Sequence, residues 1–198
     1  MKNRKTTLRK MILSAVMLTA MVSNATNELH TIPKNDLKET TFTLSYVKQG
    51  NKLIIKDLNG VVLYKEQIKD TGMYSKGFDL TSLPNGSYVF ELEKDLEIKS
   101  YPFTVNSNIV AFNENGTTVH KPFVTFKDNY IYVSKLALNN EPLDIKIYYE
   151  DDSELIYSEK IKDTQTIQKV YKLDINLSGN YKIVLKSDGK EYYEYINF

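Results

Sequence analysis

The feature that most constrains the fold of this chain is a segment that occurs twice. Tyr64 and Tyr157 lie 93 positions apart, and the residues that accompany them recur at the same offset. The first copy contains Tyr64, Glu66, Ile68, Lys69, Asp70 and Thr71, and the second contains Tyr157, Glu159, Ile161, Lys162, Asp163 and Thr164. Gly86 and Tyr88 likewise return as Gly179 and Tyr181. A period this long indicates repeated domains, because the units of solenoid proteins are only about 20 to 50 residues long.

Each copy has the sequence pattern of a series of short β-strands. Val, Ile, Tyr, Phe and Thr alternate with polar residues between clusters of Gly, Asn, Asp and Pro, and helical periodicity is scarce. In the first copy we predict strands near 41–47, 52–56, 61–67, 75–79, 87–93 and 98–105. In the second copy we predict strands near 123–126, 130–138, 143–149, 154–161, 168–174, 180–186 and 192–198. The pattern therefore favours an all-β protein.

Six or seven strands in a copy of about 80 to 90 residues suit a two-sheet sandwich better than one open sheet. The predicted fold is two tandem immunoglobulin/fibronectin-III-like antiparallel β-sandwiches. The first would cover 26–112 and the second 121–198, with 113–120 as a linker. Asn59-Gly60 predicts a two-residue hairpin in which both central residues have positive φ, and Asp152-Ser153 takes the same place in the second copy.

Both copies also contain the pattern of a tyrosine corner, in which a Tyr hydroxyl bonds upstream backbone where the chain crosses between sheets. Gly86 and Tyr88 provide it in the first copy, and Gly179 and Tyr181 in the second. Together with the strand-turn-strand segment 53–64, these corners resemble the small immunoglobulin-like sandwiches of exported Bacteroidota proteins. That group includes the C-terminal sorting domains recognised by the type IX secretion system. The resemblance implies a β-sandwich outside the cytoplasm and supplies no catalytic residue.

The first 25 residues have the composition of a secretory signal peptide. Five basic residues precede an apolar run from Met11 to Val22, and Ser23 and Ala25 place small side chains before a cleavage site. The apolar run is shorter than the ~20 residues that a transmembrane helix needs. We therefore predict cleavage after Ala25, an extracytoplasmic location (periplasmic, secreted or cell-surface) and no transmembrane anchor in the mature chain.

Charge and cysteine content exclude several classes of partner and site. Removal of the five basic residues in 1–25 leaves 21 Lys and Arg against 25 Asp and Glu, so the mature chain is mildly acidic. An acidic protein without a basic cluster lacks the attraction that drives nucleic-acid binding. The chain has no cysteine, which rules out disulfides, cysteine-ligated zinc and a lipid-modified cysteine.

No arrangement of residues in the sequence predicts catalysis. The two histidines, His30 in the N-terminal segment that we expect to be disordered and His120 in the expected linker, have no partner in a triad or a zinc site. The acidic run 150–154 offers oxygen ligands to calcium, but its position at a hairpin tip favours a solvated turn. We predict that the protein is not an enzyme and uses no cofactor or metal.

Tyrosine provides the best indication of a binding face. Ten of the fifteen tyrosines lie in the second copy. Tyr130 with Tyr132, and Tyr193 with Tyr195, share a strand face by their spacing of two, and they form the candidate face. Exposed tyrosines give flat, amphipathic contacts to proteins or sugars, although tyrosine is also simply a good strand former.

These observations favour an exported, non-enzymatic protein-interaction or structural module whose partner is a protein or a cell-surface glycan. Two alternatives remain: the C-terminal sandwich serves as a secretion-sorting module, or a sheet face binds glycan. Self-association through an exposed edge strand near Tyr192 to Phe198 is a further possibility.

Overall fold

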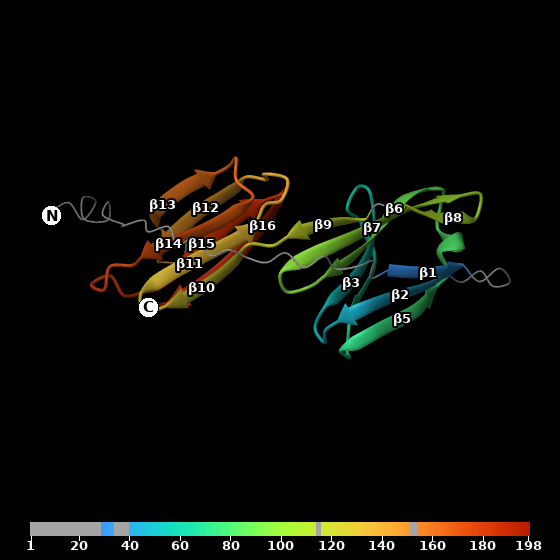
Figure 1. Ribbon diagram of the computed structural model, residues 1–198, viewed down its shortest axis with the longest axis horizontal. Coiled ribbons are helices and arrows are strands. Elements are labelled where there is room, and N and C mark those ends of the chain that lie inside the picture. Colours follow the sequence, from blue (N-terminus) through green and yellow to red (C-terminus); the bar gives the residue numbers. More distant parts are fainter. Residues whose placement is uncertain (1–28, 34–39, 114–115, 151–153) are drawn as a thin grey trace. The chain divides into compact units, whose positions relative to one another are not determined.

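The computed structural model describes residues 29–33, 40–113, 116–150 and 154–198. These residues form two compact units, one ending at Val119 and the next beginning at His120, which we call domain 1 and domain 2 (Figure 1). The predicted signal peptide lies outside the described residues. In the described part of the chain, no helix has the length and apolarity to cross a membrane.

The described residues of domain 1 form nine strands and one short 3-10 helix. They are β1 (Leu29–Pro33), β2 (Thr40–Val47), β3 (Lys52–Asp57), β4 (Val62–Gln67), β5 (Gly72–Phe78), η2 (Leu80–Ser82), β6 (Gly86–Glu93), β7 (Glu97–Asn106), β8 (Ile109–Phe112) and β9 (Thr117–His120). One sheet has the order β1-β2-β5, and the other has the order β4-β3-β6-β7-β8, with β9 also paired to β7. Neighbouring strands with a defined register run antiparallel.

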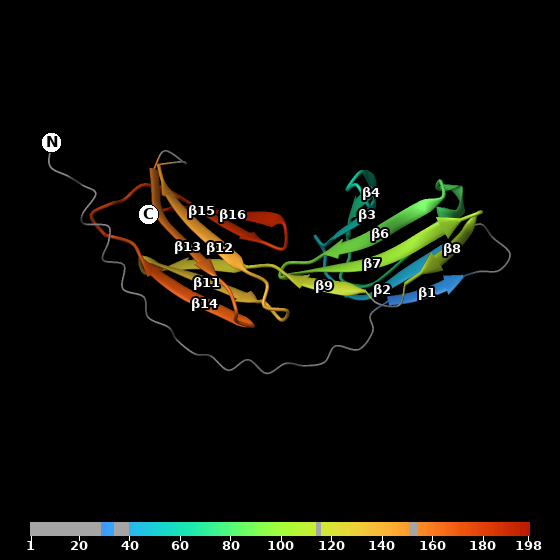
Figure 2. The ribbon, with the colours of Figure 1, turned by 90° about the horizontal axis from the view of Figure 1, so that it is seen from above.

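Domain 2 repeats this plan with seven strands. They are β10 (Phe123–Lys127), β11 (Tyr130–Leu136), β12 (Leu143–Tyr149), β13 (Glu154–Ile161), β14 (Thr166–Lys172), β15 (Asn180–Ser187) and β16 (Lys190–Asn197). The sheets have the orders β10-β11-β14 and β13-β12-β15-β16. Figure 2 shows the two layers, with β11 and β14 in one and β12, β13, β15 and β16 in the other.

The position of the fourth strand defines the type of sandwich. In both domains it pairs with the strand before it, β4 with β3 and β13 with β12, so a three-stranded sheet faces a sheet of four or more. In constant-type immunoglobulin domains the fourth strand instead joins the sheet of the first two strands. The arrangement is that of the fibronectin type III-like sandwich, and the predicted fold class is confirmed for both copies.

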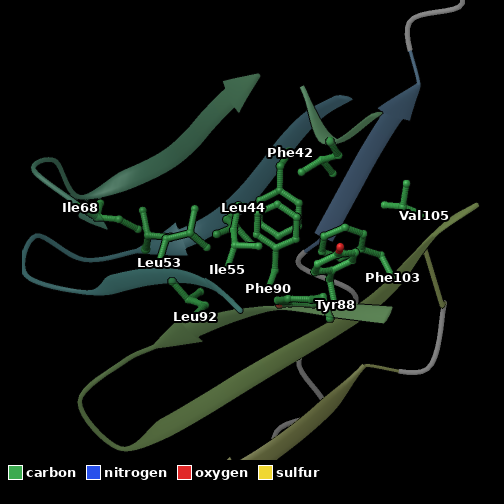
Figure 3. Close-up of a cluster of buried hydrophobic side chains, with 13 residues drawn as sticks. Phe42, Leu44, Leu53, Ile55, Ile68, Tyr88, Phe90, Leu92, Phe103 and Val105 are labelled. Atoms are coloured by element: carbon green, nitrogen blue, oxygen red, sulfur yellow. The ribbon is translucent and has the colours of Figure 1, made fainter. Parts of the chain in front are cut away.

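Alternation along each strand builds the core between the sheets. On β12, Leu143, Ile145 and Ile147 are buried while the residues between them are not. In domain 1 five of the thirteen buried core residues are aromatic, and the rings of Phe42 and Phe90 stack with centroids 4.2 Å apart across the two sheets (Figure 3). The core of domain 2 is largely aliphatic, with Ile and Leu from β11, β12 and β15 around two buried tyrosines.

One core-facing position of domain 2 carries a charge. Lys135 on β11 is only 3% exposed, and its ammonium donates to Asp188 Oδ2 at 3.2 Å and to the Leu136 carbonyl oxygen at 3.3 Å. Asp188 lies in the turn between β15 and β16, so this ion pair joins the two sheets at one end of the domain. The fold accommodates a buried cation at this position because the cation has a carboxylate partner.

Three local expectations differ from the structure. Residues 29–33, which we expected to be disordered, form β1 and pair with β2. The expected linker 113–120 contains β9, which extends the pairing along β7 that β8 begins. The described part of domain 2 has no strand that pairs with β16 in the way that β8 and β9 pair with β7. The comparison of the two copies therefore did not predict β9.

The turn between β3 and β4 is the third difference. Only Gly60 has positive φ, at +85°, and Asn59 does not. The Asp57 side chain accepts hydrogen bonds from the backbone nitrogens of Asn59 and Val61, each at 2.9 Å. This acidic side chain holds Asn59 in an Asx turn, which replaces the expected two-residue hairpin loop. The counterpart Asp152-Ser153 lies outside the described residues.

Candidate functional site

Each domain ties its inter-sheet crossing with a buried tyrosine. Tyr88 Oη donates to the Pro84 carbonyl oxygen at 2.7 Å, and Tyr181 Oη donates to the Leu177 carbonyl oxygen. Both hydroxyls bond backbone four residues upstream, which is the geometry of a tyrosine corner. Burial raises the pKa of Tyr181 to about 12, so its hydroxyl stays a donor at neutral pH. These corners are structural and offer no ligand site.

The two predicted corner glycines have different surroundings. A Cβ at Gly179 would lie 2.7 Å from Tyr149 Cε2 and 2.9 Å from Tyr149 Oη, and the residue has a φ of +156°. Tyr149 is fixed there by its hydrogen bond to the Ser178 carbonyl oxygen. A Cβ at Gly86 would make only ordinary contacts, the nearest at 3.5 Å to Tyr88 Oη. Glycine is therefore required at the second corner and replaceable at the first.

The repeated Tyr-x-Glu segment belongs to a polar cluster that joins the two sheets of domain 1. Glu66 on β4 accepts hydrogen bonds from Tyr64, from Tyr74 at 3.0 Å and from Lys76 Nζ at 2.7 Å. Tyr64 and Glu66 belong to one sheet, whereas Tyr74 and Lys76 lie on β5 in the other. We call these four residues the domain 1 carboxylate cluster. It bridges the edge strands on one open side of the sandwich.

Domain 2 builds the same cluster from the equivalent strands. Glu159 on β13 accepts hydrogen bonds from Tyr157 at 3.1 Å, from Tyr171 at 3.0 Å and from Lys169 Nζ at 2.6 Å. Tyr171 and Lys169 lie on β14, so the bridge again links the two sheets. These four residues form the domain 2 carboxylate cluster. The sequence repeat revealed the Tyr and Glu on β4 and β13. The Tyr and Lys that bond them come from β5 and β14 in the opposite sheets, and only the structure shows them.

The electrostatics of both clusters favour a fixed charge state. Hydrogen bonds from Lys76 and Tyr64 lower the pKa of Glu66 from 4.5 to about 2. Burial alone would raise the pKa of Glu159, but hydrogen bonds from Lys169 and Tyr171 outweigh burial and lower it. Burial, with the charge of Glu159, raises the pKa of Tyr157 to about 12. These groups do not exchange protons near pH 7, and general acid-base catalysis needs a pKa near the working pH.

The structure divides the four predicted face tyrosines into two pairs. Tyr130 and Tyr132 lie on β11 and point outward from the three-stranded sheet of domain 2, with ring centroids 6.3 Å apart. Tyr193 and Tyr195 lie on β16 and point outward from the four-stranded sheet. The outer faces of a sandwich point in opposite directions, so the two pairs form no common surface. Spacing along a strand gives the side of the strand but not the sheet to which it belongs.

The pair on β16 belongs to a larger aromatic surface. Strand register places Tyr148 of β12, Lys182 of β15 and Tyr195 of β16 in one row across the sheet. The next row contains Lys146, Val184 and Tyr193. We call these six residues the tyrosine–lysine face. Tyr193 and Tyr195 are 47% and 66% exposed, so their rings are available for contact.

On this face the ammonium group of one lysine lies close to two tyrosine rings. Lys182 Nζ lies 5.1 Å from the ring centroid of Tyr193 and 5.9 Å from that of Tyr195, within the range of cation–π attraction. Tyr193 Oη also donates to the Glu191 carboxylate, which fixes the ring. Sequence analysis did not assign Tyr148 to the face. Adjacent strand residues point to opposite faces, so one of Tyr148 and Tyr149 must point outward, but only the register with β15 puts Tyr148 beside Lys182.

Other candidate sites offer little chemistry. The described residues contain no group of three or more His, Asp or Glu side chains that could hold a metal ion. His120 ends β9, His30 lies in β1, and residues 151–153 of the acidic run fall outside the described part. Domain 1 has an open hollow of about 410 Å³ lined by Leu58, Tyr88, Phe103, Ala111 and Phe112 among others. Its one titratable side chain, Tyr88, is already bonded to backbone.

Comparisons with known proteins support no closer assignment. No protein-family model matches the chain, and no curated protein matches it. The chain is similar to the chicken CNTN1 FN1–FN3 domains, with 12% identity over 81% of this chain and 60% of that chain and a TM-score of 0.28. The human OSCAR ligand-binding domain gives 7% identity over 86% and 96% of the two chains, with a TM-score of 0.25.

A third solved structure concerns neurohormone perception by the receptor tyrosine kinase Torso. It gives 10% identity over 89% of this chain and 74% of that chain, with a TM-score of 0.25. At these TM-scores the overlaps carry no argument about function. The assignment of the fold rests on the strand order within each domain.

Proposed function

We propose that this protein is an exported, non-enzymatic binding module in which the tyrosine–lysine face of domain 2 contacts the partner. The observation that carries the proposal is the pair of rows on β12, β15 and β16, where three tyrosines lie outward around Lys182. Tyrosine gives a large, rigid contact area at low entropic cost, which is why binding surfaces are rich in it. A sandwich does not need outward tyrosines for its own core.

The titratable clusters support a binding role over a catalytic one. Both carboxylate clusters join two sheets, and the pKa values of their carboxyl groups, Glu66 and Glu159, are lowered away from the neutral range. The lysine and the carboxylate of each cluster also form an ion pair with one another. Their place at the sandwich edge and their duplication favour a role in folding.

Export and an extracytoplasmic location belong to the same proposal. The basic start, the apolar run and the small residues Ser23 and Ala25 support cleavage of a signal peptide. Mass spectrometry of the N-terminus of the protein from its native cell checks this, with Thr26 as the expected first residue. An intact Met1 in that material would contradict export by this route.

A pull-down from the native envelope and medium tests the binding role. Wild-type protein and the double variant Tyr193→Ala/Tyr195→Ala serve as baits, and Tyr132→Ala on the opposite outer face is the matched control. We expect partners retained by wild type and by Tyr132→Ala to be lost with the double variant. Equal retention by all three baits would contradict the proposed surface.

A second candidate function is secretion sorting by domain 2, as the resemblance to type IX sorting domains implies. The favouring observation is that domain 2 has a hydrophobic core of its own at the C-terminal side of domain 1. Removal of 121–198 should then abolish surface delivery of domain 1. Unchanged delivery of the shortened chain would end this candidate.

A further inference from the structure

We propose that the tyrosine–lysine face binds an anionic polysaccharide, laid across β12, β15 and β16. The inference rests on the proposed binding role of this face and adds the chemical class of its ligand. It follows from the placement of the rings, the sign of the charge and the position of the face on an outer sheet surface.

The three rings lie on one outer sheet face. Tyr193 and Tyr195 are two residues apart on β16, which places them about 6 to 7 Å apart along the strand. Tyr148 lies on the other side of Lys182, two strands away from Tyr195. β12 and β15 each pair with a strand on both sides, whereas β16, which carries Tyr193 and Tyr195, is the edge strand of this sheet and pairs with β15 alone. Such a surface suits the C–H faces of sugar rings, which stack on aromatic side chains.

The charge on this outer face is positive although the mature chain is acidic. The outward positions of β12, β13, β15 and β16 include four lysines and two acidic residues, namely Lys146, Lys160, Lys182, Lys186, Asp144 and Glu191. Lys160 pairs with Asp144 at 3.2 Å and Lys186 with Glu191 at 3.5 Å. These ion pairs lie in the row beyond Lys146 and Tyr193. The two rows that carry the rings contain Lys146 and Lys182 and no acidic residue, although the Glu191 carboxylate of the next row accepts a hydrogen bond from Tyr193. The excess of lysine over acidic residues on the whole face favours an anionic ligand.

Shape selects a polymer over a small molecule. The hollow described above belongs to domain 1, and the tyrosine–lysine face lies on an outer sheet surface of domain 2. A small ligand needs a concave site that surrounds most of its surface. A polymer instead gains affinity from successive contacts along an open row. An acidic polypeptide shares the charge but lacks the stacked ring surface that three tyrosines match, so we favour the polysaccharide.

The equivalent face of domain 1 supports a specific role for these residues. In the same rows it has Lys56, Val89 and Pro102, and then Ile54, Glu91 and Ser100. It has no tyrosine there, and Lys56 bonds Glu91 at 2.7 Å. The sandwich therefore folds without an aromatic outer face. The residues of domain 2 fulfil a need other than folding.

Affinity electrophoresis of the full chain through gels containing polygalacturonate tests the inference. Methyl-esterified polygalacturonate is the uncharged counterpart, and poly-glutamate is the charged polymer without sugar rings. We expect retardation by polygalacturonate only, and less retardation as NaCl rises from about 0.05 M to about 0.5 M. Tyr195→Ala and Lys182→Gln should each weaken binding by about tenfold or more, as for residues at the centre of an interface.

Two matched variants complete the design. Tyr132→Ala removes an outward tyrosine from the opposite sheet, and Lys65→Gln removes an exposed lysine from β4 of domain 1. Neither should change the retardation. Loss of binding with these controls, equal retardation by the esterified polymer, or binding to poly-glutamate alone would overturn the inference. If no polysaccharide binds while Tyr193→Ala/Tyr195→Ala still abolishes capture of a protein partner, the ligand class is wrong and the binding role stands.

Discussion

The larger sheets of the two domains have the same rows of outward positions but different chemistry. Where domain 1 has Lys56, Val89 and Pro102 across β3, β6 and β7, domain 2 has Tyr148, Lys182 and Tyr195 across β12, β15 and β16. The inward positions, in contrast, are chemically alike in the two domains. Both domains bury apolar side chains, and both link their two sheets at one edge with a cluster of Tyr, Glu and Lys. The duplicated part is thus the interior and its polar closure, and the outer face has changed between copies.

The first prediction addresses the interior. Phe90→Ala should destabilise domain 1 by about 3 to 5 kcal/mol, because it removes a buried ring that contacts Phe42, Phe78 and Phe103. Hydrogen exchange with mass spectrometry should show faster exchange in β2, β3 and β6, with β12 and β15 unchanged. Val89→Ala, next to it on the outer face, is the control and should cost much less. Equal acceleration in both domains would show that they do not fold as separate units.

The second prediction concerns the carboxylate clusters. Glu66→Gln should cost domain 1 about 1 to 3 kcal/mol, since it removes charged hydrogen bonds from Lys76 and two tyrosines. Urea denaturation followed by circular dichroism measures the cost. Glu93→Gln breaks a pair with Lys52 at 3.7 Å whose side chains are about as exposed as those of Lys76 and Glu66. It is the matched control and should cost about 0 to 1 kcal/mol. Equal costs for the two variants would contradict a special role for the cluster.

The pH dependence of stability provides an independent check of the same cluster. Glu66 has a pKa of about 2 in the folded chain, below its ordinary value of 4.5. A carboxyl whose pKa is lowered by folding stabilises the fold fully above its unfolded pKa, and this contribution is lost as pH falls toward the folded value. Domain 1 should therefore lose stability between about pH 5 and about pH 2. Glu66→Gln should make that loss smaller, and an unchanged slope would contradict the lowered pKa.

The third prediction contrasts the tyrosine corners. Gly179→Ala should destabilise domain 2 by about 1 to 3 kcal/mol, because the new Cβ would overlap the fixed ring of Tyr149. Gly86→Ala should change domain 1 by only about 0.5 kcal/mol, because its Cβ meets no atom closer than 3.5 Å. Thermal unfolding of the two variants measures the contrast. Similar losses would show that the corners are equivalent after all.

The smallest effect on stability is expected from exchange of the outer faces. Domain 1 with Lys56→Tyr, Val89→Lys and Pro102→Tyr should keep its stability within about 1 kcal/mol, since these side chains point away from the core. It should gain retardation by polygalacturonate when Tyr195→Ala has removed binding from domain 2. A stable exchanged protein that stays unretarded would show that the two rows alone do not suffice.

Sequence patterns predicted the strands because their signals are local. Alternation of apolar and polar residues located β2 to β7 and β10 to β16 within a few residues, and the repeat predicted two sandwiches. The corner tyrosines were found because Gly and Tyr recur at a fixed distance.

Contacts across the sandwich could not be predicted in the same way. Glu66 meets Tyr74 and Lys76 only because β4 and β5 lie at facing edges of two different sheets. For the same reason the sequence could not show that Tyr132 and Tyr193 lie on opposite faces of domain 2. The spacing of residues along each strand indicates which side chains share a side, but not the sheet to which the strand belongs. β1 was missed because its sequence, Leu-His-Thr-Ile-Pro, does not alternate between apolar and polar residues.

The carboxylate clusters have a consequence for how this protein reaches its folded state. Both domains close one side with hydrogen bonds and ion pairs formed by Glu66 and Glu159, and the chain contains no thiol. Folding therefore requires neither an oxidant nor a disulfide isomerase. The protein should fold equally well in a reducing cytoplasm and in an oxidising medium, and dithiothreitol should leave its structure unchanged.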